Sequence, residues 1–208
     1  VFNDKGKIDF IKPIYRNEAH RIIEECMLSA NVCAANYLLD NPGDGIYRNH
    51  ETPSEEKLTN LRDFLLDFGL TLGGGSEPTV KDYGEILKKI ANRPDAHLLQ
   101  TVLLRSMQQA AYSSKNLGHF GLAYSAYTHF TSPIRRYPDL LVHRAIKSQL
   151  DGNNPKIKNI EAIALHCSTT ERTADDATRD VESWLKCYFM QDKVGESFWG
   201  TVAGVTGF

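Results

Sequence analysis

The sequence lacks several short patterns that would assign a function directly. None of its four cysteines forms a Cys-x-x-Cys pair, which argues against a zinc knuckle. It has no Gly-x-Ser-x-Gly motif and no P-loop, so neither serine-hydrolase nor P-loop nucleotide chemistry is indicated. Its densest acidic cluster is Asp175, Asp176 and Asp180, but this spacing spreads the carboxylates around a helix. We therefore predict no metal site within the chain.

Long apolar runs and an excess of positive charge are also missing. No stretch approaches the roughly 18 apolar residues of a membrane-spanning helix, and the first ten residues carry no signal-peptide pattern, so we expect no membrane contact. The four cysteines fall within helical patterns, which is typical of free thiols in a reducing, cytoplasmic environment. The formal net charge of −2 excludes a basic coat over the whole surface, so any contact with an acidic partner has to be local.

Hydrophobic periodicity predicts an α+β fold that is mostly helical. Two short strands around an Asp-Lys-Gly-Lys turn predict a β-hairpin within residues 1–15. Six helices are expected over residues 17–40, 52–69, 79–91, 95–112, 133–150 and 158–190. Capping signals begin two of them, Thr52 with Glu55 and Thr79 with Asp82. Residues 113–130 are predicted to form an ordered loop, and residues 195–208 alternate like a strand.

The stretch HFTSPIRRYPDLLVHR, residues 129–144, concentrates positive charge. Within residues 131–148 four cations face a single acid: Arg135, Arg136, Arg144 and Lys147 against Asp139. Ser132 and Pro133 predict the N-cap and first position of a helix. Its backbone N–H groups, the Ser132 hydroxyl and the two adjacent guanidinium groups would together hold a phosphate. On spacing alone, a capped helix whose arginines pair with acids elsewhere explains the pattern equally well.

Two further features fit a nucleic-acid partner. Aromatic rings on which bases can stack precede the arginines: Phe120, Tyr124, Tyr127 and Phe130. The first helix carries a polar stripe that can bond to sugar hydroxyls: Asn17, His20, Glu24 and Asn31. An ordinary solvated helix face is the better explanation of the stripe on pattern alone. The opposite face, which includes Ile22 and Ile23, is expected to be buried, and His119 is expected to be a packed polar ring.

Four longer motifs carry a family resemblance. They occur in the order AHRIIEECMLSANVCAA, LLRSMQQAAY, HFGLAYSAYTHFTSPIRRYPDLLVHR and ERTADDATRDVESWLK. Together they resemble bacterial members of the RNase II (RNB) family across essentially all 208 residues. The resemblance implies a 3′-to-5′ exoribonuclease that hydrolyses single-stranded RNA processively to nucleoside 5′-monophosphates, using Mg²⁺. It also implies that RNA enters a deep channel of an RNB domain, which an OB-fold RNA-binding domain follows.

The resemblance implies roles for individual residues. Arg135 matches the arginine of the family's SPIR motif, which contacts phosphate at the reaction centre, and Arg136 matches a neighbouring Lys or Arg. Glu24 matches the first Glu of an IEE motif, which reads a ribose 2′-hydroxyl, and Asn31 lies further along the same helix. The catalytic candidate is thus Arg135, and the RNA-binding candidates are Glu24, Asn31, Tyr127, Phe130, Ser132 and Arg136. The family's Mg²⁺-binding aspartates belong upstream of Val1, so the chain alone is predicted to be inactive.

These observations give a prediction and two alternatives. We predict that residues 1–190 are the C-terminal part of an RNB catalytic domain and that residues 195–208 are the first strand of an OB-fold domain. The full-length protein is expected to be a monomer that acts on single-stranded RNA. A non-catalytic RNA-binding module would keep the arginines and rings but need no aspartate cluster upstream. A purely helical scaffold would bind no RNA, whereas phosphate contacts would give a steep salt dependence of binding.

Overall fold

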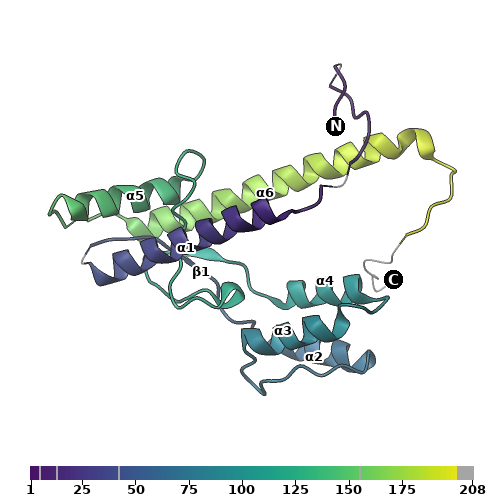
Figure 1. Ribbon diagram of the computed structural model, residues 1–208, viewed down its shortest axis with the longest axis horizontal. Helices are drawn as coiled ribbons and strands as arrows, with labels where there is room; N and C mark the ends of the chain where they lie inside the picture. The colour runs from purple at the N-terminus through teal and green to yellow at the C-terminus, as the bar shows by residue number, and fades with distance from the viewer. Residues whose placement is uncertain (5, 13, 42, 155, 201–208) are drawn as a thin grey trace.

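The computed structural model describes residues 1–200 except 5, 13, 42 and 155. Its elements in chain order are α1 (Glu18–Asp40), β1 (Tyr47–Asn49), α2 (Glu55–Asp67), α3 (Val80–Ile90), α4 (Ala96–Ser106), β2 (Ala111–Ser113), the 3₁₀ turn η1 (Phe120–Leu122), α5 (Tyr137–Leu150), α6 (Ile160–Met190) and the 3₁₀ turn η2 (Gln191–Lys193) (Figure 1). The fold is mostly helical α+β, as predicted. β1 and β2 pair antiparallel, with Tyr47 opposite Ser113.

Helices α1, α5 and α6 pack around the two-stranded sheet. Ala35, Val142 and Ala145 are almost completely buried where α1 meets α5. Ala164 of α6 packs in a second cluster with Tyr112 of β2. The loop between β2 and α5 therefore crosses a region fixed by three helices, and this loop carries most of the candidate site residues.

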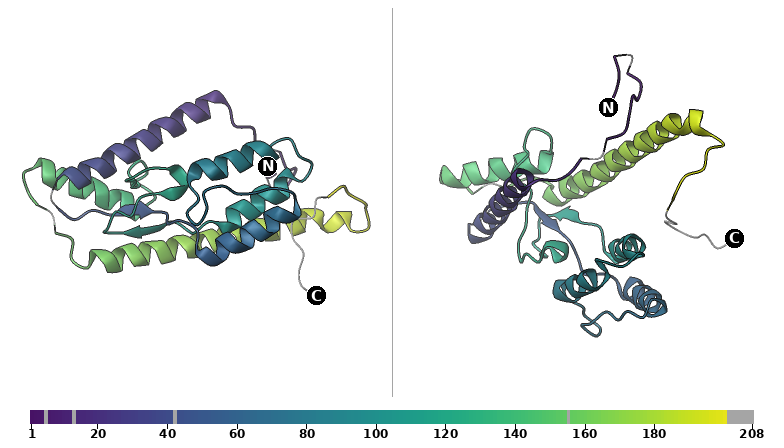
Figure 2. Two further views of the ribbon diagram at one scale, coloured as in Figure 1. Left: turned by 90° about the horizontal axis from the view of Figure 1, so that it is seen from below. Right: turned by 45° about the vertical axis from the view of Figure 1, so that its right-hand side comes forward.

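Helices α2, α3 and α4 form a separate cluster beside the sheet (Figures 1 and 2). The most deeply buried side chains of its core, at most 2% exposed, are Leu61, Leu65, Ile86, Ile90 and Leu99. Phe120 of η1 packs against this cluster and meets Tyr83 edge to face, with ring centroids 5.8 Å apart. The loop that holds η1 thus joins the two halves of the molecule.

Helix α6 leaves the core after its first turns. Its buried residues are Ala164, Cys167 and Ser168, and the helix is largely exposed from Arg172 to Met190. Figure 2 shows this part extending away from the other helices. The helix confirms the long helix predicted over residues 158–190. In the described part of the chain, no helix combines the length and the apolarity that crossing a bilayer requires.

Several predicted helix limits needed correction. The capping box of Thr79 and Asp82 is present at α3, but α2 is capped by Ser54 and not by Thr52, since the Ser54 hydroxyl accepts from the Lys57 N–H. The helix predicted over 95–112 ends at Ser106. The reason is tertiary, because the backbone N–H of Tyr112 donates to the Ser168 hydroxyl while Tyr112 pairs with β1.

The two predicted β features at the chain ends have different outcomes. The N-terminal hairpin is present as an antiparallel bridge between Phe2 and Ile8, and the N–H groups of Asn3 and Asp9 donate across it to the carbonyls of Lys7 and Val1. Of the strand predicted over 195–208, residues 195–200 form no strand, and residues 201–208 lie outside the described residues.

The exposed side of α1 also corrects a prediction. Its buried residues are Asn31, Ala34, Ala35 and Leu38, whereas Ile22 and Ile23 are about three-fifths exposed. The buried residues of α1 lie in its C-terminal half, where the helix packs against α5, whereas Ile23 lines a cavity and stays exposed. The four cysteines are unpaired, and only Cys167 is buried.

Candidate functional site

The arginine stretch forms a closed turn before α5 and not the first turn of a helix. The carbonyl of Ser132 accepts from the N–H groups of Arg135 and Arg136, at 3.3 and 3.0 Å. Helix α5 begins at Tyr137, with Arg136 at the N-cap and Pro138 in its first positions. Proline has no N–H and its ring would clash inside a helix that ran on from Ser132. The prediction that Ser132 is an N-cap is therefore wrong, and Pro138 restarts the helix.

Asp139 fastens this turn from within α5. Its side chain is fully buried, and its Oδ2 accepts from the Ser132 N–H and from Nη2 of Arg136, both at 2.8 Å. The Ser132 N–H is therefore not free for a phosphate. Of the four clustered cations, Arg136 forms the ion pair with this acid, at the i,i+3 spacing of a helical pair.

The side chain of Arg135 is in a different setting from that of Arg136. It is exposed, and within the described residues its guanidinium makes no ion pair and no hydrogen bond. It lines a cavity of about 410 Å³ between the turn and α6, which we call the Arg135 pocket. The residues that line it include Tyr112, Arg135, Arg136, Glu171 and Asp175. A free guanidinium at the mouth of a cavity fits a phosphate-binding role.

A second cavity brings four predicted residues together. It has a volume of about 440 Å³ and is lined by Glu24, Asn31, Tyr127 and Arg136, with Arg16, His20, Ile23, Met27 and Leu28. We call it the Glu24 pocket. The carboxylate of Glu24 is about half exposed and forms an ion pair with Arg16, a partner that no local sequence pattern predicts. Arg136 lines both cavities and so stands in the wall between them.

Asn31 does not lie on an exposed polar stripe, and that prediction is wrong. It is 4% exposed. Its Nδ2 donates to the Tyr127 hydroxyl and its Oδ1 accepts from the Phe130 N–H, both at 2.9 Å. Asn17 and His20, from the same predicted stripe, close the N-terminus of α1 as a capping box. Of the four stripe residues, Glu24 and His20 are exposed and line the pocket.

Two rings predicted to stack on bases are largely covered by the fold. Tyr127 is 5% exposed, with its ring stacked on Tyr124 at a centroid distance of 5.9 Å. Phe130 lies parallel to the His143 ring with centroids 4.0 Å apart. The open-platform interpretation of Tyr127 is therefore wrong, because a buried ring offers no face to a base. Phe130 retains partial exposure, and its base contact stays a prediction.

Histidines behind the arginines are held neutral. Burial, with a contribution from the nearby Arg136 charge, lowers the pKa of His129 to about 3, and its Nδ1 lies 2.7 Å from the Tyr112 hydroxyl. Burial next to His50 lowers the pKa of His119 to about 4, and its Nδ1 accepts from the Leu122 N–H. His119 is thus a packed polar ring, as expected. At neutral pH the positive charge of the region therefore resides on arginines.

Arg48 is a cation that sequence analysis missed. It lies over the Tyr112 ring, 4.5 Å from the centroid, and forms an ion pair with Glu171 at 2.6 Å. The pair neutralises one of the two acids that line the Arg135 pocket. No spacing rule links residues 48 and 171, so only the fold reveals this contact.

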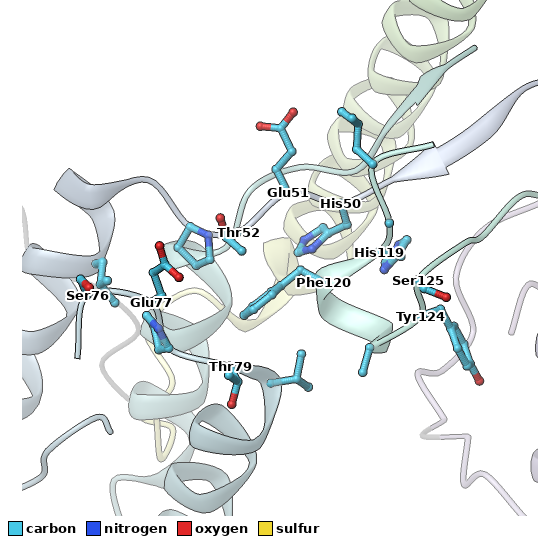
Figure 3. A pocket seen from close by; sticks show the side chains of 17 residues that line it. His50, Glu51, Thr52, Ser76, Glu77, Thr79, His119, Phe120, Tyr124 and Ser125 are labelled. Carbon is cyan, nitrogen blue, oxygen red and sulfur yellow. The ribbon is translucent and has the colours of Figure 1, made fainter. Parts of the chain in front are cut away.

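A cavity of larger volume than these two lies elsewhere in the molecule (Figure 3). Its volume is about 970 Å³, and it includes none of the seven predicted residues and no lysine or arginine. His50 and His119 stack in its wall with centroids 5.1 Å apart, and Phe120 continues the row. His50 is held by the Gly121 N–H at its Nδ1. With Glu51 and Glu77 at its edge, this cavity does not suit a phosphate, so size is a poor guide to the site here.

Metal chemistry has no ligand set among the described residues. Within residues 1–200 apart from the four gaps, no three His, Cys, Asp or Glu side chains lie together as metal ligands. Asp176 pairs with Arg179 on the surface of α6. The described residues thus combine the exposed Arg135 guanidinium with no cluster of metal-ligating side chains.

Comparisons with known proteins agree with this arrangement. Residues 1–152 match the RNB domain family. The chain is 50% identical to Ribonuclease R of Vibrio cholerae over 222 residues and 47% identical to that of Escherichia coli over 221 residues, matching 100% of this chain and 27% of each relative. It also resembles the structure of Mycoplasma genitalium RNase R in complex with ribose methylated single-stranded RNA, with a TM-score of 0.90, 28% identity, and coverage of 100% of this chain and 34% of that one.

These relatives are longer than the chain, which spans about a quarter of the length of the curated ones. The family match covers most of the described residues, including Ser132, Arg136, Asp139 and all the residues that line the Glu24 pocket. The chain belongs to the RNB domain family.

Proposed function

We propose that this chain is part of a 3′-to-5′ exoribonuclease that hydrolyses single-stranded RNA processively to nucleoside 5′-monophosphates with Mg²⁺. One observation carries the proposal: Arg136 is shared by two cavities, one holding the Glu24 carboxylate and the other the free Arg135 guanidinium. A ribose and its phosphate are neighbouring groups on one strand, and the two cavities offer neighbouring groups of matching chemistry. The likeness to RNase R in complex with RNA supports RNA as the partner.

In the proposed function, residues of opposite charge bind different groups of the RNA. The Glu24 carboxylate, paired with Arg16, offers hydrogen-bond acceptors, so it can take a bond from a ribose 2′-hydroxyl that DNA lacks. Arg135 carries five N–H donors and no internal partner, so it can meet the charge that develops on a phosphate as the bond breaks. Further contacts with RNA would come from the same segment. They are the Arg136 side chain and the Ser132 hydroxyl within the turn, and the Phe130 ring just before it.

The proposed reaction uses Mg²⁺, but the described residues of this chain are not its ligands. The described residues do not fit it, because they provide no cluster of oxygen ligands. The proposal therefore places its ligands in the preceding part of the full-length protein, and no step is assigned to the metal here. The contribution of the chain is to bind and orient the RNA 3′ end and to stabilise phosphate charge.

We also propose the domain division that the sequence suggests. Residues 1–190 would be the C-terminal part of the catalytic domain, supported by the packing of α6 against β2 and α5. Residues 195–208 would begin an OB-fold RNA-binding domain, supported by their alternating sequence.

The test uses the full-length protein and a single-stranded RNA labelled at its 5′ end. With Mg²⁺ the RNA should shorten from its 3′ end, with nucleoside 5′-monophosphates as the released product. The 208-residue chain, assayed beside it, should release none above a contaminant control. Binding of RNA with no shortening would support the non-catalytic RNA-binding module, and internal cleavage would contradict the exonuclease.

A further inference from the structure

We propose that Asp139 is a positioning residue that holds the turn of residues 131–136 in its working geometry. The inference rests on the proposed function and assigns a role to a residue that touches neither pocket's contents. Asp139 is 0% exposed, and one of its oxygens accepts both the Ser132 N–H and the Arg136 guanidinium. Two ends of one short loop are thus attached to a single buried atom.

The burial makes the pair mutually dependent. A buried carboxylate is costly unless it is paired and hydrogen bonded. Within the described residues its second oxygen, Oδ1, has no hydrogen-bond partner, and neither has the buried Nε of Arg136. The Asp139 charge therefore depends on Arg136 and on the Ser132 N–H, with the N-terminal end of α5 as further support. Each partner in turn has its position set by Asp139.

The contacts of Asp139 with the Ser132 N–H and the Arg136 guanidinium, which we call the Asp139 clamp, explain why the two adjacent arginines differ. The Arg136 guanidinium is bonded to Asp139 inside the turn, whereas the exposed Arg135 side chain lines the Arg135 pocket without a partner among the described residues. The N–H of Arg135 is bonded to the Ser132 carbonyl, which is itself held by the clamp. Asp139 thus fixes the backbone of Arg135 and leaves its donors free. A merely helix-capping acid would need neither full burial nor a contact with Ser132.

The experiment compares single-turnover cleavage and RNA affinity in the full-length protein at a temperature well below its melting point. Asp139→Asn keeps the shape of the side chain and removes its charge. We expect cleavage to slow about 10²-fold, as for other small misplacements of a reacting group, while RNA affinity stays close to that of the wild type. Asp151→Asn, an exposed acid at the other end of α5, is the matched control and should change neither quantity.

A double-mutant cycle separates positioning from a general structural effect. If Asp139 acts through Arg136, then Asp139→Asn should cost little extra in an Arg136→Gln background. Cleavage losses that multiply would overturn the proposal. So would a parallel loss of affinity and rate that follows the folded fraction in melting curves.

Failure of the proposed function is distinguishable from failure of this inference. A wild-type protein that does not shorten RNA refutes the exonuclease, and the clamp is then read by amide hydrogen exchange. The Ser132 N–H should exchange slowly in the wild type and about tenfold faster or more in Asp139→Ala, as expected when a charged acceptor is removed. Equal exchange in the two proteins would overturn the clamp itself.

Discussion

Replacing Asn31 with alanine tests whether this residue holds the site together or contacts RNA. Asn31 is buried in α1 and connects that helix to the loop before α5 through Tyr127 and Phe130. Alanine removes both hydrogen bonds and leaves the Phe130 N–H and the Tyr127 hydroxyl without this partner. A residue whose only task was to contact RNA would leave stability unchanged.

The magnitude follows from those two bonds. Each buried group that loses its partner costs about 1–3 kcal/mol, and the better helix propensity of alanine returns about 0.5 kcal/mol. The net loss is roughly 2–5 kcal/mol. In a chain of this size 1 kcal/mol corresponds to about 2–4 °C, so the melting temperature should fall by about 5–15 °C.

The assay is thermal unfolding of the 208-residue chain, followed by circular dichroism. Asn36→Ala is the matched control, because Asn36 lies exposed on the same helix and gains the same propensity. It should melt at or slightly above the wild-type temperature. If the Asn31→Ala and Asn36→Ala proteins melt at the same temperature, the two Asn31 hydrogen bonds do not stabilise the fold, and Asn31 is again a candidate RNA contact.

Three further predictions concern charge. Arg135→Ala in the full-length protein should slow cleavage about 10²–10³-fold with an unchanged melting temperature, because its side chain is exposed and unpaired among the described residues; a lowered melting temperature would assign it a structural role. Glu24→Ala should relax the preference for RNA over RNA with deoxyriboses near its 3′ end, at a cost of about 1.5–3 kcal/mol for one charged hydrogen bond, and an unchanged preference would contradict the 2′-hydroxyl contact. The pKa of His129 is lowered to about 3 in the folded chain, so the unfolded state binds more protons below pH 6.5. Stability should therefore be full above that pH and fall on acidification, by about 2 kcal/mol at pH 5 for this residue. His129→Gln should flatten this part of the pH profile, and an unaltered profile would contradict the assignment.

Local signals in the sequence were enough for most helices. Hydrophobic periodicity predicted the ends of α1, α3 and α6 to within about two residues. The reason is that the amphipathic pattern and the residues that begin and end a helix are local features of the sequence. The errors fall where a distant segment decides. The helix predicted over 95–112 is shortened because Tyr112 pairs with β1 and Ser168. No pattern within residues 95–112 carries that information.

The site shows the same division. Charge clustering and family motifs placed Arg135, Arg136 and Glu24 beside cavities. They also placed Asn31 and Tyr127 at the Glu24 pocket, but they did not reveal that both side chains are buried and bonded to each other across 96 positions of the chain. A polar residue on a helix is ambiguous in sequence, because the same amide can serve solvent, a ligand or a buried loop. Burial decides among these, and burial is a property of the fold.

The opposite settings of Arg135 and Arg136 follow from one physical requirement. A guanidinium that must meet a phosphate needs its donors free, yet its backbone must be held still, because each ångström of misplacement weakens the effect on a reacting group. One arginine cannot satisfy both demands through its own side chain. Here Arg136 uses its donors inside the protein, on Asp139, and so fixes the turn, while the neighbouring Arg135 keeps its donors outside. The concentration of cations in a chain of net charge −2 is thus not a uniform basic patch, and neutralising the two arginines should have different consequences.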